Sequence, residues 1–177
     1  MKKILAFAGS NSSTSINKRL AVYTAKQLKE VGIVALDLND FNLPMYGIDY
    51  ENEHGIPENA QLFLNQIKES DGIVLSLAEH NGAYSTAFKN IFDWMSRIDG
   101  KLWSDTPMLL LATSPGGRGG ASVLDIAKGR FPYMGGNIVA TFSLPSFNDN
   151  FSESGIKDET LQASLNEAIA TFQQAVK

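Results

Sequence analysis

Five short apolar runs, each followed by a segment with helical periodicity, constrain the fold of this chain more than any other feature. The runs cover Lys2–Ala8, Ile33–Leu38, Gly72–Ala78, Pro107–Ser114 and Asn137–Ser143. Strands that are apolar on both faces are typical of parallel sheets covered by helices on both sides. Because strand and helix alternate along the chain, the sequence predicts an α/β fold with a mostly parallel sheet.

Length and composition limit the class of protein. The chain has 177 residues, 44% of them hydrophobic and 19% charged, which suits one folded domain over residues 1–177. Its net charge of −4 provides no cationic surface for nucleic acid, and the absence of Cys excludes disulfides and thiol chemistry. No run approaches the roughly 20 apolar residues that cross a bilayer, and the N-terminal run is too short for a secretory signal. We therefore expect a cytoplasmic protein with no nucleic-acid or membrane partner.

A hydroxyl-rich loop follows the first predicted strand. The stretch AGSNSSTSINKRL, residues 8–20, places five hydroxyl side chains and one amide between Ser10 and Ser15. Such residues form turns and cap helices, and the backbone N–H groups at a helix start also bind anions. The loop lacks the three glycines of a dinucleotide fingerprint and the Gly-Lys-Ser/Thr of a P-loop. Two interpretations stay open: plain helix capping, or a site for a single phosphate group.

Two further loops follow predicted strands at the same edge of the sheet. Glu79–Ser85 contains the turn pair Asn81-Gly82, and Pro115–Gly120 places four glycines around Arg118. Taken singly, the first is an ordinary strand-to-helix turn and the second a flexible loop with a solvated arginine. Ligands of open α/β sheets bind outside the carboxyl ends of the strands. The convergence of three unusual loops at that edge therefore favours a ligand site.

No constellation of side chains points to catalysis by the protein's own groups. His54 and His80 are the only histidines, and neither has a partner at metal-ligating helical spacing, so no metal site is expected. Glu79 adjoins His80, but consecutive residues rarely point the same way and no nucleophile accompanies them. The G-x-S-x-G turn of serine hydrolases is also absent from the sequence. The sequence therefore identifies no catalytic side chain.

Together, the three loops and the segments around them resemble a known family. GSNSSTSINKRLA, AEHNGAYSTAFKNIFDWMSR and SPGGRGGASVL, with the closing stretch LPSFNDNFSESGIKDETL, are similar to the NADPH-dependent FMN reductases of the flavodoxin-like superfamily. The segments occur in the family's order and span nearly the whole chain. The resemblance implies a three-layer sandwich around a five-stranded parallel sheet, with strand order 2-1-3-4-5, that binds FMN without a covalent bond.

The resemblance also implies which residues contact FMN. The phosphate would be held by the first loop, at Ser10, Ser12, Ser15, Ile16 and Asn17. The isoalloxazine ring would be bordered by Glu79, His80, Asn81 and Gly82, and its other edge by Ser114, Gly116, Gly117 and Arg118. Two positions depart from the family pattern. Ser12 stands where many relatives have an arginine, and His80 stands where the family commonly has the tyrosine of Pro-Glu-Tyr-Asn.

In function, the resemblance implies an FMN-dependent oxidoreductase. NADPH or NADH would pass a hydride to flavin N5, and the electrons would go to a small-molecule acceptor: a quinone, an azo compound, a metal oxyanion or free flavin. Relatives whose flavin lies at a subunit interface imply a homodimer or homotetramer. Two alternatives stay open, namely a flavodoxin-like electron carrier without steady-state turnover and a non-enzymatic module that binds a quinone or a nucleotide.

Overall fold

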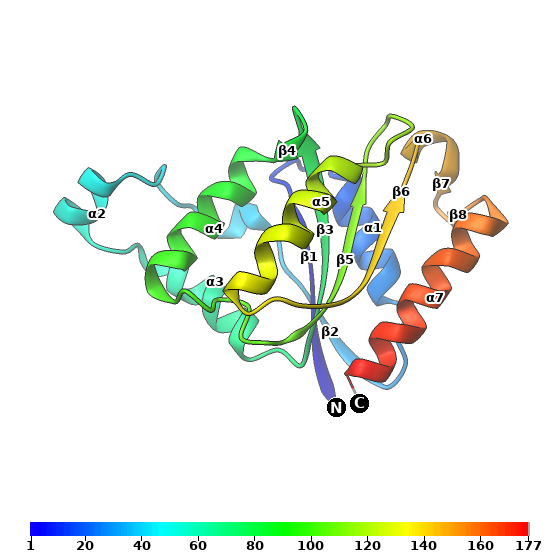
Figure 1. The fold of residues 1–177 in the computed structure, drawn as a ribbon, viewed down its shortest axis with the longest axis horizontal. Helices are drawn as coiled ribbons and strands as arrows, with labels where there is room; N and C mark the ends of the chain where they lie inside the picture. Colours follow the sequence, from blue (N-terminus) through cyan, green and yellow to red (C-terminus); the bar gives the residue numbers. More distant parts are fainter. Residues whose placement is uncertain (177) are drawn as a thin grey trace.

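The central element of the protein is a twisted parallel sheet (Figure 1). The computed structural model describes residues 1–176, so Lys177, the last residue of the expected domain, lies outside the described residues. In spatial order the parallel strands are β2 (Val31–Ala35), β1 (Lys2–Gly9), β3 (Gly72–His80), β5 (Pro107–Thr113) and β6 (Asn137–Leu144). A short strand, β4 (Ala83–Tyr84), pairs antiparallel with the end of β3. Counting the parallel strands alone, the order is 2-1-3-4-5, which confirms the predicted fold.

Helices cover both faces of the sheet and make it the middle of three layers (Figure 1). One face carries α3 (Glu58–Lys68), α4 (Thr86–Ile98) and α5 (Ala121–Arg130), and the other carries α1 (Ile16–Ala25) and α7 (Glu159–Ala175). Successive residues of a strand point to opposite faces. In β1, Leu5 and Phe7 therefore pack in the core beneath α3, α4 and α5, while Ile4 and Ala6 pack in the core beneath α1 and α7. Both faces are buried, which is why the strand runs are evenly apolar.

Shorter elements connect this framework. They are the 3₁₀ helices η1 (Leu38–Asp40) and η2 (Phe131–Met134), the helices α2 (Ile48–His54) and α6 (Phe147–Asn150), and the strands β7 (Phe151–Ser152) and β8 (Gly155–Ile156). β7 and β8 form a small antiparallel hairpin ahead of α7. Helix α2 stands away from the sheet at one end of the molecule (Figure 1), and none of its residues is buried.

The second strand lies earlier than the sequence predicts. The apolar run suggested Ile33–Leu38, but the strand pairs with β1 from Val31, opposite Lys2, to Ala35, opposite Ala6. It ends there because the carboxylate of Asp37 accepts a hydrogen bond from the backbone N–H of Asn39 at 2.9 Å, which caps η1. Pairing with the neighbouring strand and a local cap therefore decide both ends of this strand.

The turn after β3 is a hairpin rather than an ordinary passage from strand to helix. Asn81 and Gly82 have φ values of 52° and 77°, and β4 folds back so that Glu79 pairs with Tyr84. Two consecutive residues with positive φ are typical of the type I′ turn that joins two-residue hairpins, for which Asn-Gly is the preferred pair. The hairpin lengthens β3 to His80, beyond the predicted end at Ala78.

Candidate functional site

The carboxyl ends of β1, β3 and β5 meet at one edge of the sheet, where the three loops that follow them surround a hollow of about 320 Å³. We call this hollow the central pocket. The strand register pairs Gly9 with Leu77 and Ala78 with Thr113, which brings the starts of the loops together. Between β1 and β3 the strand order reverses direction, and such a switch point is where open α/β sheets bind ligands.

Most of the residues expected to hold a flavin line the central pocket. They are Ser10, Ser12, Ser15, Ile16, Asn17, Glu79, His80 and Ser114. The other expected residues, which do not line it, are Asn81, Gly82, Gly116, Gly117 and Arg118. The first two occupy the hairpin turn, and the other three lie in the exposed part of the third loop. The lining also includes residues outside the expected set: Thr14, Ala78, Thr113 and Pro115.

The first loop is held in shape by its own hydroxyl groups. The backbone N–H of Ser12 donates to Ser10 Oγ at 3.2 Å, and that of Thr14 donates to Ser12 Oγ at 3.3 Å. Ser15 caps α1, because its Oγ accepts a hydrogen bond from the N–H of Lys18 at 3.1 Å. In the described part of the chain, the N–H groups of Ile16 and Asn17 have no acceptor. The loop therefore presents a helix start with free N–H donors to the central pocket, as an anion site requires.

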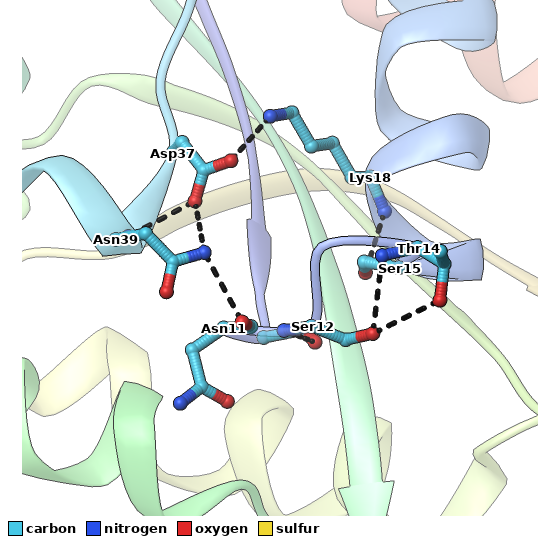
Figure 2. A network of polar contacts seen from close by, with 8 residues as sticks. Asn11, Ser12, Thr14, Ser15, Lys18, Asp37 and Asn39 are labelled. Carbon is cyan, nitrogen blue, oxygen red and sulfur yellow. Dashed lines mark hydrogen bonds and ion pairs between the residues drawn. The ribbon is translucent and has the colours of Figure 1, made fainter.

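A polar network fixes the outer side of the same loop (Figure 2). The side-chain amide of Asn39 donates to the carbonyl of Asn11 at 3.1 Å and to a carboxylate oxygen of Asp37 at 2.8 Å. The other carboxylate oxygen of Asp37 accepts a hydrogen bond from Lys18 Nζ, and this contact lowers the pKa of the Asp37 carboxyl below its ordinary value. The positive charge of Lys18 is thus matched by a carboxylate, so the loop offers mainly neutral donors.

The side chain of Asn17 is used inside the protein. Its Nδ2 donates to the carbonyl of Thr113 at 3.1 Å, and its Oδ1 accepts from the N–H of Thr113 at 3.0 Å and from Ser76 Oγ at 2.7 Å. All three residues are buried. Asn17 therefore joins α1 to β3 and β5 beneath the central pocket, and what faces a ligand from this residue is its backbone N–H.

Glu79 makes a comparable tie from β3 to α5. Gly120, the residue before α5, has no side chain to cap the helix and adopts a left-handed conformation with φ of 77°. The carboxylate of Glu79 accepts a hydrogen bond from the N–H of Val123 at 3.0 Å, which satisfies a donor of the first helical turn from a distant part of the chain. His80, the next residue, is exposed at the rim. The two residues thus have different surroundings, as expected for consecutive positions.

The third loop is built around one carbonyl group. The oxygen of Gly116 accepts hydrogen bonds from the N–H of Gly119 at 3.2 Å, the N–H of Ser146 at 2.9 Å and the hydroxyl of Ser114 at 3.3 Å. Arg118 is exposed, and its Nη2 donates to Ser122 Oγ at 3.1 Å on the first turn of α5. Arg118 therefore remains beside the central pocket rather than in it.

Comparison with known proteins agrees with this geometry. The sequence profile of the NADPH-dependent FMN reductase family matches residues 2–149. The chain belongs to this family. A relative in the family, the 2-hydroxy-1,4-benzoquinone reductase of a Burkholderia species, is 32% identical over 134 residues, which are 75% of this chain and 71% of that enzyme.

The quinone reductase of Escherichia coli is 27% identical over 123 residues, which make up 67% of this chain but 63% of that enzyme. The chain thus matches less than two thirds of the length of this reductase. Among solved structures, the flavoenzyme FerB of Paracoccus denitrificans, an NAD(P)H:(acceptor) oxidoreductase, superposes with a TM-score of 0.76 at 24% identity, over 99% of this chain and 97% of that one. At that identity the likeness establishes the flavodoxin-like fold.

The sequence did not predict Ser76 as the buried hydrogen-bond partner of Asn17. Ser76 is the one hydroxyl in the apolar run GIVLSLA of β3, and a lone Ser in a buried strand is a signal for a specific hydrogen bond. The role of Thr113, at the end of the apolar strand β5, was also not predicted. Its hydroxyl donates to the carbonyl of Leu144 at 2.7 Å.

Over residues 1–176, no three His, Cys, Asp or Glu side chains gather as a metal site would need. Within the same range, no helix has the length and hydropathy required to span a bilayer.

Proposed function

We propose that the protein is an FMN-dependent NAD(P)H oxidoreductase that reduces a quinone or an azo compound, with the chain acting as a single FMN-binding domain. The observation that carries this proposal is the central pocket. It lies at the switch point of the sheet, presents free N–H groups at the start of α1, and belongs to a member of the FMN reductase family. Metal oxyanions and free flavin as acceptors, and a cytoplasmic location, stay predictions.

In this proposal the first loop holds the phosphate of FMN. The hydroxyls of Ser10, Ser12 and Ser15 and the backbone N–H groups of Ile16 and Asn17 supply the hydrogen bonds. The hydroxyl proton of Ser15 remains available, because its oxygen serves as the helix cap. Several neutral donors together with the positive end of the helix dipole stabilise a phosphate dianion without an arginine. That arrangement fits the serine at position 12.

The second and third loops border the isoalloxazine ring in the same proposal. Glu79, His80, Asn81 and Gly82 lie on one side, and Ser114, Gly116, Gly117 and Arg118 on the other. Bound FMN would supply the hydride chemistry, which needs no catalytic side chain. The protein would orient the ring between the β3–β4 hairpin and the start of α5, which Glu79 caps. The Arg118 guanidinium, at the rim, is placed to meet the phosphates of the entering nicotinamide nucleotide.

We also propose that the protein works as a homodimer, with the segment around α2 at the contact between subunits. Met45, Ile48 and Ile56 on this segment are 66%, 52% and 41% exposed. The segment is nevertheless held firmly, since Trp94 Nε1 donates to the carbonyl of Pro44 at 2.8 Å and Arg97 pairs with Glu51. Exposed apolar side chains on a rigid projection are typical of a subunit interface. Sedimentation tests this proposal: the wild type should sediment as a dimer, and the Ile48→Asp variant should dissociate to monomers. A wild type that is monomeric at micromolar concentration contradicts the proposal.

The function is tested by the flavin first and by turnover second. The purified or FMN-reconstituted protein should release FMN near 1:1 on denaturation and oxidise NADPH or NADH continuously when a quinone is supplied. Replacing Ser10 and Ser15 with Ala should weaken FMN more than riboflavin, by about 1.5–3 kcal/mol for each lost bond to the charged group.

Three outcomes would contradict the proposal in different ways. Bound FMN without steady-state turnover would favour the electron carrier. No flavin affinity would favour the non-enzymatic module. Equal losses for FMN and riboflavin in the serine variants would show that these hydroxyls do not contact the phosphate.

A further inference from the structure

A second and larger hollow, of about 870 Å³, runs along α1 and meets the central pocket at Thr14 and Ser15, which line both. We call it the α1 groove. One wall is a single face of α1 and its C-cap residue, with Lys18, Arg19, Val22, Tyr23 and Lys26 at helical spacing. The other wall is the start of the β7–β8 hairpin, with Phe151, Ser152 and Glu153. The proposed function makes no use of this groove.

The α1 groove is cationic in a protein whose net charge is −4. Lys18, Arg19 and Lys26 line it, against the single carboxylate of Glu153. Lys18 is paired with Asp37, but Arg19 and Lys26 have no ion-pair partner anywhere in residues 1–176. Two cations are thus available to an anionic ligand in this groove.

Arg19 is held in place by aromatic rings rather than by a carboxylate. Its guanidinium carbon lies 5.2 Å from the ring centre of Phe147 and 5.3 Å from that of Phe151. The two rings stack on each other, with centroids 4.7 Å apart and planes inclined by 17°. A guanidinium held on aromatic faces keeps its N–H groups for other partners, and their fork geometry matches phosphate oxygens.

The groove also has an apolar floor. Val22, Tyr23 and Phe151 form it. The ring of Tyr23 is fixed from both ends, because its hydroxyl donates to Gln162 Oε1 at 2.6 Å and its edge packs against Phe151 at a centroid distance of 5.3 Å. The two rings meet edge to face, at 85°, and form an ordered apolar surface between cationic side chains. Such a surface suits a ligand with an apolar base and attached phosphates.

We propose that the α1 groove binds the base and phosphates of an adenosine nucleotide. Two molecules carry this chemistry: NAD(P)H, the co-substrate of the proposed function, in its adenosine half, and FAD, which that function does not require, in its adenylate half. The choice of these two molecules rests on the proposed function, whereas the groove and its cationic side chains do not. Because the groove opens on the phosphate loop, either molecule can place its adenosine and the adjacent phosphate by Arg19 and Lys26 and reach toward the central pocket. The nicotinamide end of NAD(P)H is then left to Arg118.

Titration calorimetry with ADP tests the groove directly. ADP is titrated into the protein alone and into the protein saturated with FMN, with inorganic phosphate as the comparison ligand. In Arg19→Gln and in Lys26→Gln the Kd for ADP should rise about tenfold, the equivalent of one charge-assisted hydrogen bond. Lys26 is exposed, so its variant tests charge without disturbing the aromatic stack. In Glu153→Gln the Kd should fall, because an opposing charge is removed.

Lys29→Gln is the matched control. Lys29 is an exposed lysine that follows α1 in the chain and does not line the groove. ADP binding that is absent, that matches inorganic phosphate in affinity, or that responds equally to all lysine variants would overturn the proposal. These measurements need no turnover, so a groove that fails in a protein with normal flavin content is distinguished from a failure of the proposed function.

Two further titrations identify the source of the nucleotide. If FAD binds the apoprotein more tightly than FMN and loses that advantage in Arg19→Gln, the groove holds the adenylate of FAD. If FMN and FAD bind alike and the KM for NAD(P)H rises in Arg19→Gln, it holds the adenosine half of the co-substrate. If neither quantity changes in the variant, the groove has no adenosine ligand and the proposal is wrong.

Discussion

Replacing Asn17 with Ala should destabilise the protein strongly while leaving its preference for FMN over riboflavin intact. The substitution removes three hydrogen bonds, to Ser76 Oγ and to the N–H and carbonyl of Thr113, at distances of 2.7–3.1 Å. Asn17, Ser76 and Thr113 are 3%, 0% and 1% exposed, so water cannot replace the lost partners. At about 1 kcal/mol for each bond, the expected loss is about 3 kcal/mol, a large part of the 5–15 kcal/mol that stabilises a typical domain.

Urea unfolding of four variants measures this loss and assigns it. Ser76→Ala removes one of the three bonds and should cost about 1 kcal/mol. The double variant should cost less than the sum of the single ones, because the bond between Asn17 and Ser76 is counted in both. Asn11→Ala is the control. It makes the same change on an exposed residue of the same loop and should cost less than about 0.5 kcal/mol.

Flavin binding then separates a structural role for the Asn17 side chain from direct contact with the phosphate. The backbone N–H of residue 17 persists in the Ala variant, so the ratio of FMN to riboflavin affinity should stay as in the wild type. A variant that keeps wild-type stability but loses the preference for FMN would refute the reasoning. It would mean that the amide binds the phosphate rather than joining α1 to the sheet.

Four other substitutions have definite expected outcomes. Gly120→Ala should lower the free energy of unfolding by about 2 kcal/mol or more, because φ is 77° and a Cβ there would lie 2.8 Å from a side chain of β5. Gly82 has the same φ but open space around it, so Gly82→Ala should cost about 1 kcal/mol in the same urea assay. Asp37→Asn should lower stability near neutral pH. The lowered pKa of Asp37 means that its contribution is present above the ordinary value of 3.8 and is lost as pH falls through the lowered one, so the two unfolding curves should converge in acid. Arg118→Ala should lower kcat/KM for NAD(P)H by about one to two decades with little loss of FMN, and a collapse of FMN binding with an unchanged nicotinamide step would contradict the proposed role of Arg118.

The sequence by itself determined the fold class and the edge of the sheet that carries the site. Evenly apolar runs indicate strands whose two faces are both buried. A strand such as Lys2–Gly9 can bury both faces only between two layers of helices. Parallel strands all end at the same edge, so the loops after three of them were bound to converge. Residue type also predicted the turn at Asn81-Gly82, since few other pairs accept positive φ twice.

What only the tertiary structure decided is how each polar side chain near the pocket is used. Asn17 and Ser76 are far apart in the chain, and nothing local shows that they bond to each other beneath the phosphate loop. Glu79 likewise caps a helix that begins more than forty residues later, a contact made by the order of strands rather than by spacing. The α1 groove exists because the β7–β8 hairpin folds against α1 and brings Phe151 beneath Arg19. Sequence patterns record propensity and burial, whereas hydrogen-bond partners from distant segments are chosen only when the sheet has placed them side by side.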